Sequence, residues 1–162
     1  MKRLLAIVLL LFCVASVAGA DEAGWKAGTA KAIITPEKPL WMAGYGGRKH
    51  PAEGKLHDLW IRVLALQDKE GHTGIILSSD TLGMPQSIYN ATCKSLKEKF
   101  DLERSQIMLH SSHTHCGPVL RGALYDVYPL DDEQRRLIDE YSTNLEQKIV
   151  ETFGRALANL VP

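Results

Sequence analysis

Three apolar segments, and the lengths of chain between them, constrain the fold of this sequence more than any other feature. Residues 59–67 read LWIRVLALQ, residues 73–80 read TGIILSSD and residues 106–112 read QIMLHSS. The stretch DKEGH between the first two suits a hairpin turn and favours antiparallel pairing. A helix is expected over residues 85–100, and the order strand–helix–strand favours a parallel pair for the last two segments. The sequence therefore predicts an α/β fold with a mixed β-sheet.

Further elements are expected on both sides of this unit. Residues 25–36, WKAGTAKAIITP, are typical of a first strand. Residues 36–54 are rich in proline and glycine and predict a long loop, which in a compact domain is commonly functional. Residues 131–160 predict one long helix whose first turn carries acidic residues suited to a positive helix N-terminus. Its apolar stripe, typical of a core-facing helix, consists of Leu137, Tyr141, Leu145, Ile149, Phe153 and Leu157.

The first twenty residues have the pattern of a secretory signal. Lys2 and Arg3 precede an apolar run from Leu4 to Val14, and small residues follow at 18–20. We expect cleavage after residues 1–20, a mature chain over residues 21–162, and a secreted or periplasmic protein. An uncleaved N-terminal anchor is the alternative, although the run is shorter than the roughly 20 residues that span a bilayer. No transmembrane segment is expected once the signal is removed.

Composition bounds the class of protein. The chain has 162 residues, of which 45% are hydrophobic and 23% charged, which is enough for one domain with its own core. Its formal net charge is zero and no basic block stands out, so nucleic acid is not an expected partner. Without the signal, Cys93 and Cys116 remain. They could form a disulfide in an exported chain, but Cys93 also lies on an apolar helical face, which favours a place in the core.

The segment SSHTHCGP, residues 111–118, is the main candidate for chemistry. It follows the third apolar segment, and ligands of α/β sheets gather beyond the carboxyl ends of parallel strands. In an extended strand His113 and His115 would point to one face and His110 to the other. Two converging imidazoles could bind zinc, transfer a proton or complete a structural turn. Spacing alone leaves all three open.

Five blocks of this sequence resemble the neutral/alkaline, non-lysosomal ceramidases, which are zinc amidases. SSHTHCGP is similar to the His-Thr-His-Ser-Gly-Pro signature of that family. The other four blocks follow the family's order and are GTAKAIITP (28–36), MAGYG (42–46), HDLWIRVLAL (57–66) and SSDTLGM (78–84). The resemblance implies the N-terminal part of a larger zinc-amidase domain with a mixed sheet and flanking helices.

This resemblance also implies site residues and a reaction. It assigns His113 as a zinc ligand, His115 as the catalytic residue that hydrogen-bonds the substrate, and Gly44 as a backbone that lies beside the substrate. Asp80 is expected to support the site rather than to take part in chemistry. The implied reaction is hydrolysis of the N-acyl amide of a ceramide-type lipid to a fatty acid and a sphingoid base, with Zn²⁺ as cofactor. The implied partners are this lipid and, through peripheral contact, a membrane surface.

Two departures from the family pattern bear on that function. Cys116 stands where the family usually has serine, which places a thiol next to the expected metal site. The family takes its remaining zinc ligands, a histidine, a glutamate and a tyrosine, from sequence far downstream, so we expect this chain to be the N-terminal portion of the catalytic domain. The alternatives are a non-catalytic exported domain that keeps the fold, and a hydrolase of another amide or ester. Nothing assigns the missing ligand positions to the other histidines, His50, His57, His72 and His110.

Overall fold

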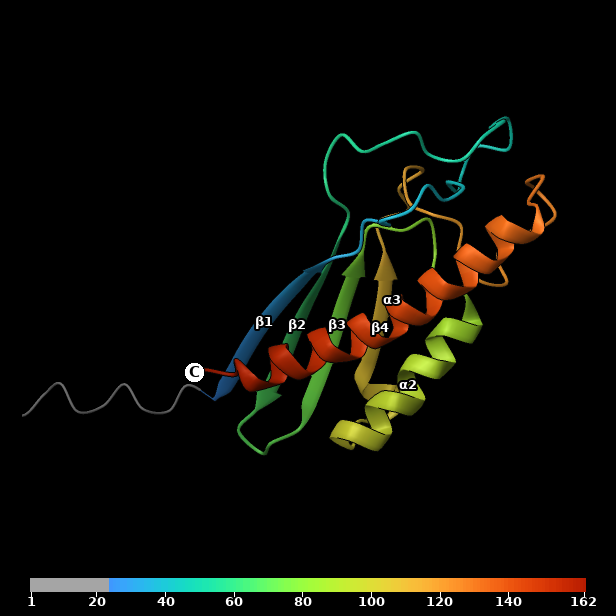
Figure 1. Cartoon of the computed structure of the whole chain (residues 1–162). Coiled ribbons are helices and arrows are strands. Elements are labelled where there is room, and N and C mark those ends of the chain that lie inside the picture. Colours follow the sequence, from blue (N-terminus) through green and yellow to red (C-terminus); the bar gives the residue numbers. More distant parts are fainter. Residues whose placement is uncertain (1–23) are drawn as a thin grey trace, which may run out of the picture.

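The computed structural model of the protein describes residues 24–162, so the expected signal peptide lies outside the described residues. Four strands, two helices and one short 3₁₀ helix follow each other along the chain (Figure 1). Their bounds are β1 Trp25–Ile33, β2 Trp60–Asp68, β3 Thr73–Ser79, α2 Gln86–Phe100, η1 Arg104–Gln106, β4 Ile107–Ser111 and α3 Asp132–Ala158. The expected α/β class and the expected order of elements are confirmed.

The four strands form one mixed sheet in the order β1-β2-β3-β4. β1 pairs with β2 and β2 with β3 in antiparallel fashion, whereas β3 and β4 are parallel. The DKEGH turn closes the β2–β3 hairpin, where the amide of Asp68 donates to the carbonyl of His72 at 3.0 Å. The carboxyl ends of β3 and β4 therefore lie side by side at the end of the sheet away from this turn (Figure 1).

Helices α2 and α3 pack together and cover one face of the sheet (Figure 1). Two glycines allow the close approach. A Cβ on Gly28 in β1 would lie 2.1 Å from the carbonyl oxygen of Ala156, so the end of α3 rests directly on the β1 backbone. A Cβ on Gly154 in α3 would lie 2.8 Å from the ring of Phe100, which brings α3 against the last turn of α2.

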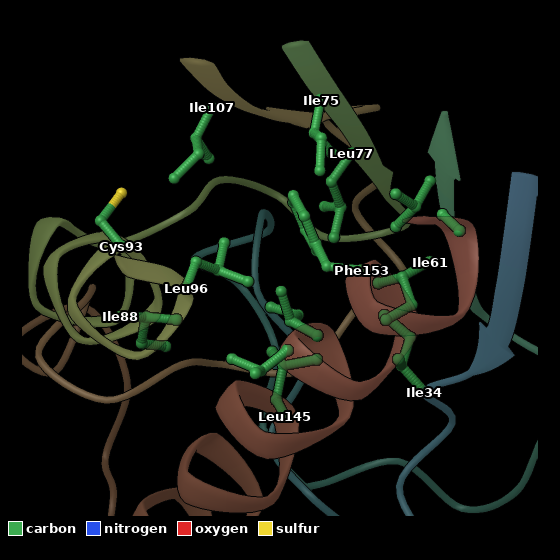
Figure 2. Packing of buried hydrophobic residues seen from close by; sticks show 14 of the residues in the cluster. Ile34, Ile61, Ile75, Leu77, Ile88, Cys93, Leu96, Ile107, Leu145 and Phe153 are labelled. Carbon is green, nitrogen blue, oxygen red and sulfur yellow. The ribbon is translucent and has the colours of Figure 1, made fainter. Parts of the chain in front are cut away.

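The main hydrophobic core fills the space between this sheet face and the two helices (Figure 2). Phe153 of α3 is fully buried and its ring projects toward Leu77 of β3 and Leu96 of α2. Cys93 belongs to the same cluster, as expected from its helical face, and burial raises the pKa of its thiol. Cys116 is exposed, and both cysteines are free thiols, so neither forms a disulfide in residues 24–162.

Helix α3 is amphipathic along its 27 residues. Its first turn is capped by Asp131, whose carboxylate accepts from the amide of Gln134 at 2.7 Å. The stripe predicted from the sequence faces the core, with Leu137, Leu145, Ile149 and Phe153 buried. The charged face is exposed, and no helix within residues 24–162 is long and apolar enough to cross a membrane.

A second hydrophobic cluster ties two long loops to the start of α3. It consists of Leu40, Trp41, Ala43, Val119, Tyr128, Leu130, Leu137 and Ile138. The loops span residues 34–59 and 112–131, and both lie beyond the carboxyl ends of β3 and β4 (Figure 1). This second cluster therefore fixes the loops that carry the candidate site.

Candidate functional site

His113 and His115 follow β4 but are not part of it. The strand ends at Ser111, and His113 has a left-handed backbone with φ of 59°. Strand alternation was expected to place the two side chains on one face and His110 on the other. This reason is wrong, because both histidines lie beyond the end of the strand. The rings nevertheless meet, with centroids 5.2 Å apart and planes at 66°. A turn, not a strand, brings the two imidazoles together.

His113 is held by a backbone carbonyl from the loop that follows β3. Its Nδ1 lies 2.8 Å from the carbonyl oxygen of Leu82. Because a carbonyl can only accept, Nδ1 carries the proton, and the neutral ring then has its lone pair on Nε2. His113 is exposed, so this lone pair faces away from the protein backbone that orients it. A histidine that ligates a metal is commonly oriented in this way.

His115 is packed between the 34–59 loop and its own turn. The Tyr45 ring meets it edge-on with centroids 4.6 Å apart. Gly44 lies behind the ring, and a Cβ at Gly44 would lie only 2.4 Å from the Cγ atom of His115. The Nδ1 atom of His115 is buried and has no hydrogen-bond partner among residues 24–162. The imidazole is thus positioned by packing, with its Nδ1 left without a partner.

A set of long-range contacts holds Gly44 and His115 in register. Met42 and Pro118 form an isolated antiparallel β-bridge between the two loops. The amide of Gly44 donates to the hydroxyl of Tyr128 at 2.8 Å. Arg48 donates through Nη2 to the carbonyl oxygen of His115 at 2.5 Å. Sequence reasoning did not identify Arg48 or Tyr128, because no local spacing signals contacts between loops so far apart.

Asp80 supports the end of the sheet. Its Oδ2 accepts from the amide of Trp60 at 2.9 Å and lies 3.3 Å from Nη1 of Arg62. These contacts join the carboxyl end of β3 to the start of β2. They agree with the supporting role expected for Asp80.

A groove of about 900 Å³ runs along the 34–59 loop and ends beside the histidine turn. Its wall includes Met42, Leu56 and Leu59 from the loop side, and Cys116 and Pro118 from the turn. Leu56 is fully exposed to solvent. The groove also carries charged side chains such as Lys38, Lys55 and Asp58, so its wall is mixed, and it reaches Cys116, the residue that follows His115 in sequence.

Zinc requires more donors than this turn provides. A catalytic zinc usually has about three protein ligands. Within residues 24–162, one group of three possible ligand residues exists, Asp68, Glu70 and His72, and it lies in the β2–β3 turn at the opposite end of the sheet. His113 is exposed and its tautomer is fixed, so it fits a single zinc ligand, and the described residues do not complete the coordination shell around it.

Comparisons with known proteins support the fold. No family model and no curated protein matches the sequence. Among solved structures, the chain is similar to neutral ceramidase from Pseudomonas aeruginosa, with a TM-score of 0.71 and 23% identity over 88% of this chain. It is also similar to a ceramidase complexed with C2, with a TM-score of 0.68 and 23% identity over 86% of this chain.

These matches define the class of fold and its extent. The chain has a ceramidase-like α/β fold, as expected from the sequence blocks. It spans 23% of the length of the first of these ceramidases and 22% of the second. At this identity and coverage the comparison establishes only the fold of the chain.

Proposed function

We propose that this chain contributes the His113–His115 part of a zinc-dependent amidohydrolase site. The substrate class is a ceramide-type lipid, whose N-acyl amide is hydrolysed to a fatty acid and a sphingoid base. The observation that carries the proposal is the contact between Nδ1 of His113 and the Leu82 carbonyl, because it leaves Nε2 as the ligand atom. The ceramidase-like fold supports the choice of reaction.

In the proposed site His113 is one zinc ligand, and the remaining ligands come from outside residues 24–162. A bound zinc ion would supply an activated water and polarise the amide carbonyl. The contribution of His113 is orientation, since its ring is fixed by Leu82 before any metal arrives. Such preorganisation lowers the entropic cost of assembling the site.

His115 is proposed to act on the substrate rather than on the metal. Its ring lies 5.2 Å from that of His113, which places a hydrogen-bonding imidazole next to the ligand position. From there it can hydrogen-bond the reacting carbonyl or the leaving amine. Gly44 has two roles in this proposal, since it makes room for the His115 ring and leaves bare backbone beside the substrate.

The groove beside the turn supports a lipid as substrate. The apolar part of its wall includes Met42, Leu59 and Pro118, and the wall reaches Cys116, which follows the imidazole proposed to act on the amide in sequence. An acyl or sphingoid chain in this groove would place the polar amide near the histidines. Burial of such a chain is favourable by about 0.8 kcal/mol for each methylene.

Zinc titration followed by NMR of the histidine rings tests the proposal on the chain itself. We expect Zn²⁺ to perturb Nε2 of His113, weakly because the donor set is incomplete. His113→Ala should remove this response, while His115→Ala should retain it. His50→Ala, a change at an exposed histidine of the 34–59 loop, is the matched control and should behave as the unmodified protein. Loss of zinc binding in His115→Ala, or binding confined to the Asp68–Glu70–His72 group, would contradict the assignment.

A further inference from the structure

The two site histidines are held in different ways. Nδ1 of His113 is fixed by the carbonyl of Leu82, whereas Nδ1 of His115 is buried and has no hydrogen-bond partner among residues 24–162. Because Nδ1 is buried, any group on which the His115 imidazole acts must meet its other nitrogen, Nε2. The rotation of the His115 ring decides where Nε2 points. Within the described residues this rotation is set by packing contacts, since no hydrogen bond to the ring sets it.

Tyr45 and Arg48 supply those contacts from the 34–59 loop. The Tyr45 ring meets the His115 imidazole edge-on, with centroids 4.6 Å apart. The Cζ atom of Arg48 lies 5.2 Å from the centroid of the Tyr45 ring, within the range of a cation–π contact. Nη2 of Arg48 also donates to the carbonyl oxygen of His115 at 2.5 Å, a charge-assisted hydrogen bond. Arg48 therefore contacts both the backbone of His115 and the ring that packs against its imidazole.

The charge of Arg48 is not neutralised by a carboxylate within residues 24–162. Arg62 and Arg121, in contrast, form ion pairs with Asp80 and Glu146. Arg48 is half-buried, and its Nε atom is buried without a hydrogen-bond partner. A permanent charge in such a place costs free energy. A costly arrangement beside a candidate site indicates a role in the site rather than in the stability of the fold.

We propose that Arg48 is a positioning residue for His115, acting through the Tyr45 ring and through the His115 carbonyl. The hydrogen bond holds the backbone of the turn, and the stacked guanidinium holds Tyr45 against the imidazole. One attachment on the backbone and one on the ring fix both the place and the rotation of His115. The inference deepens the proposed function and rests on it for the role of His115 toward the substrate. Misplacement of a reacting group by about 1 Å can lower turnover about 100-fold, so the orientation of Nε2 is the contribution of Arg48 to the reaction.

NMR of the histidine rings in the purified chain tests the proposal. The nuclear Overhauser effect between the rings of His113 and His115, whose centroids lie 5.2 Å apart, reports on their arrangement. Arg48→Met should abolish this effect and shift the His115 resonances, while His113 keeps its own because Leu82 holds it. Arg48→Lys should restore part of the effect, since lysine can donate to the carbonyl but has no planar group to stack on the tyrosine. Lys49→Met, which removes one positive charge at the exposed neighbouring residue, is the matched control and should leave the rings unchanged.

Tyr45 provides a second test that does not depend on the folding of an Arg48 variant, because its side chain is 59% exposed. Tyr45→Ala should abolish the Overhauser effect between the histidine rings. Tyr45→Phe should keep it, since the ring is the part of Tyr45 that meets His115. An intact effect in Arg48→Met or in Tyr45→Ala, or an equal loss in Lys49→Met, would overturn the proposal. A lower melting temperature of Arg48→Met with the effect intact would likewise overturn it, because Arg48 would then only stabilise the fold.

The zinc response of His113 separates this proposal from the proposed function. A response that persists in Arg48→Met, together with loss of the Overhauser effect between the rings, supports both. Absence of the response in the unmodified protein would refute the proposed function and would leave the effect of Arg48 on the His115 ring to be decided by the Overhauser measurement alone.

Discussion

The ring of His115 packs so closely against Gly44 that no room remains for a Cβ atom at residue 44. Gly44 has φ of 109°, a backbone conformation that L-residues with a Cβ rarely adopt, and the ring lies where that Cβ would point. A side chain at residue 44 would therefore suffer both backbone strain and steric overlap with the His115 ring. The position of the imidazole depends on the absence of a side chain in a different loop.

Gly44→Ala is expected to destabilise the fold by about 1–3 kcal/mol, from positive-φ strain and displacement of His115. The ring resonances of His115 should shift in the same variant. Thermal unfolding and NMR measure the two effects. Gly47→Ala is the matched control in the same loop, since a Cβ there meets nothing within 4 Å. Equal effects from the two substitutions would mean that Gly44 does not position the ring.

His72 provides a pH-dependent contact at the other end of the sheet. Its Nδ1 lies 2.9 Å from Oδ2 of Asp68, and this hydrogen bond raises the pKa of His72 above its ordinary value of 6.5. A raised folded-state pKa contributes stability below the unfolded pKa, and this stability is lost as the pH rises through the folded pKa. We expect Asp68→Asn to lower the pKa of His72, as followed by NMR titration. Glu70→Gln should lower it less, because Glu70 acts on the imidazole only through its charge; an unchanged pKa in Asp68→Asn would refute the contact.

At this scale the sequence indicated candidate site residues but not how they are placed. The pair His113–His115 could be found from its motif, and its position beyond β4 from the strand order. The turn that brings the rings together could not, because it depends on the left-handed backbone of His113 and on the carbonyl of Leu82. Arg48 and Tyr128 were not predicted for a similar reason, since their contacts join loops distant in sequence.

At the scale of elements, apolar periodicity located each strand and helix to within a few residues. Strand β1 is the clearest difference, because it ends at Ile33 rather than at residue 36. The hydroxyl of Thr35 accepts from the amide of Leu59 and donates to Asp58, both at 2.9 Å. The side chain of Thr35 thus replaces the backbone hydrogen bonds of the strand at this position, and apolar periodicity does not predict such a replacement.

Among these elements, the N-cap of α3 can be tested directly by substitution. Asp131→Ala removes the acceptor for the amide of Gln134 and should cost about 1 kcal/mol of unfolding free energy. Chemical denaturation measures the loss. Glu151→Ala, at an exposed position within the helix, serves as control and should change stability by less than about 0.5 kcal/mol. A similar loss in both variants would show that the cap contributes nothing specific.

For the molecule as a whole, the incomplete donor set limits the expected activity. The purified chain should bind zinc weakly and should not hydrolyse a fluorescent ceramide, because residues 24–162 offer His113 without a full shell around it. Isothermal titration measures the affinity, and neutral ceramidase from Pseudomonas aeruginosa is the positive control for turnover. Robust turnover by the purified chain would mean that its own residues complete the site.

The two hydrophobic clusters described above imply two cooperative units of different stability. Tyr141 packs against both clusters and donates to the carbonyl of Ile34 at 2.6 Å, so it joins them. The smaller cluster holds mainly loops, which exchange amide hydrogens through local opening more readily than sheets do. We expect the amide of Val119, which donates to the Trp41 carbonyl, to exchange before that of Leu77 in β3. Hydrogen exchange would then show the histidine turn opening while the sheet stays closed, and simultaneous exchange would show a single unit.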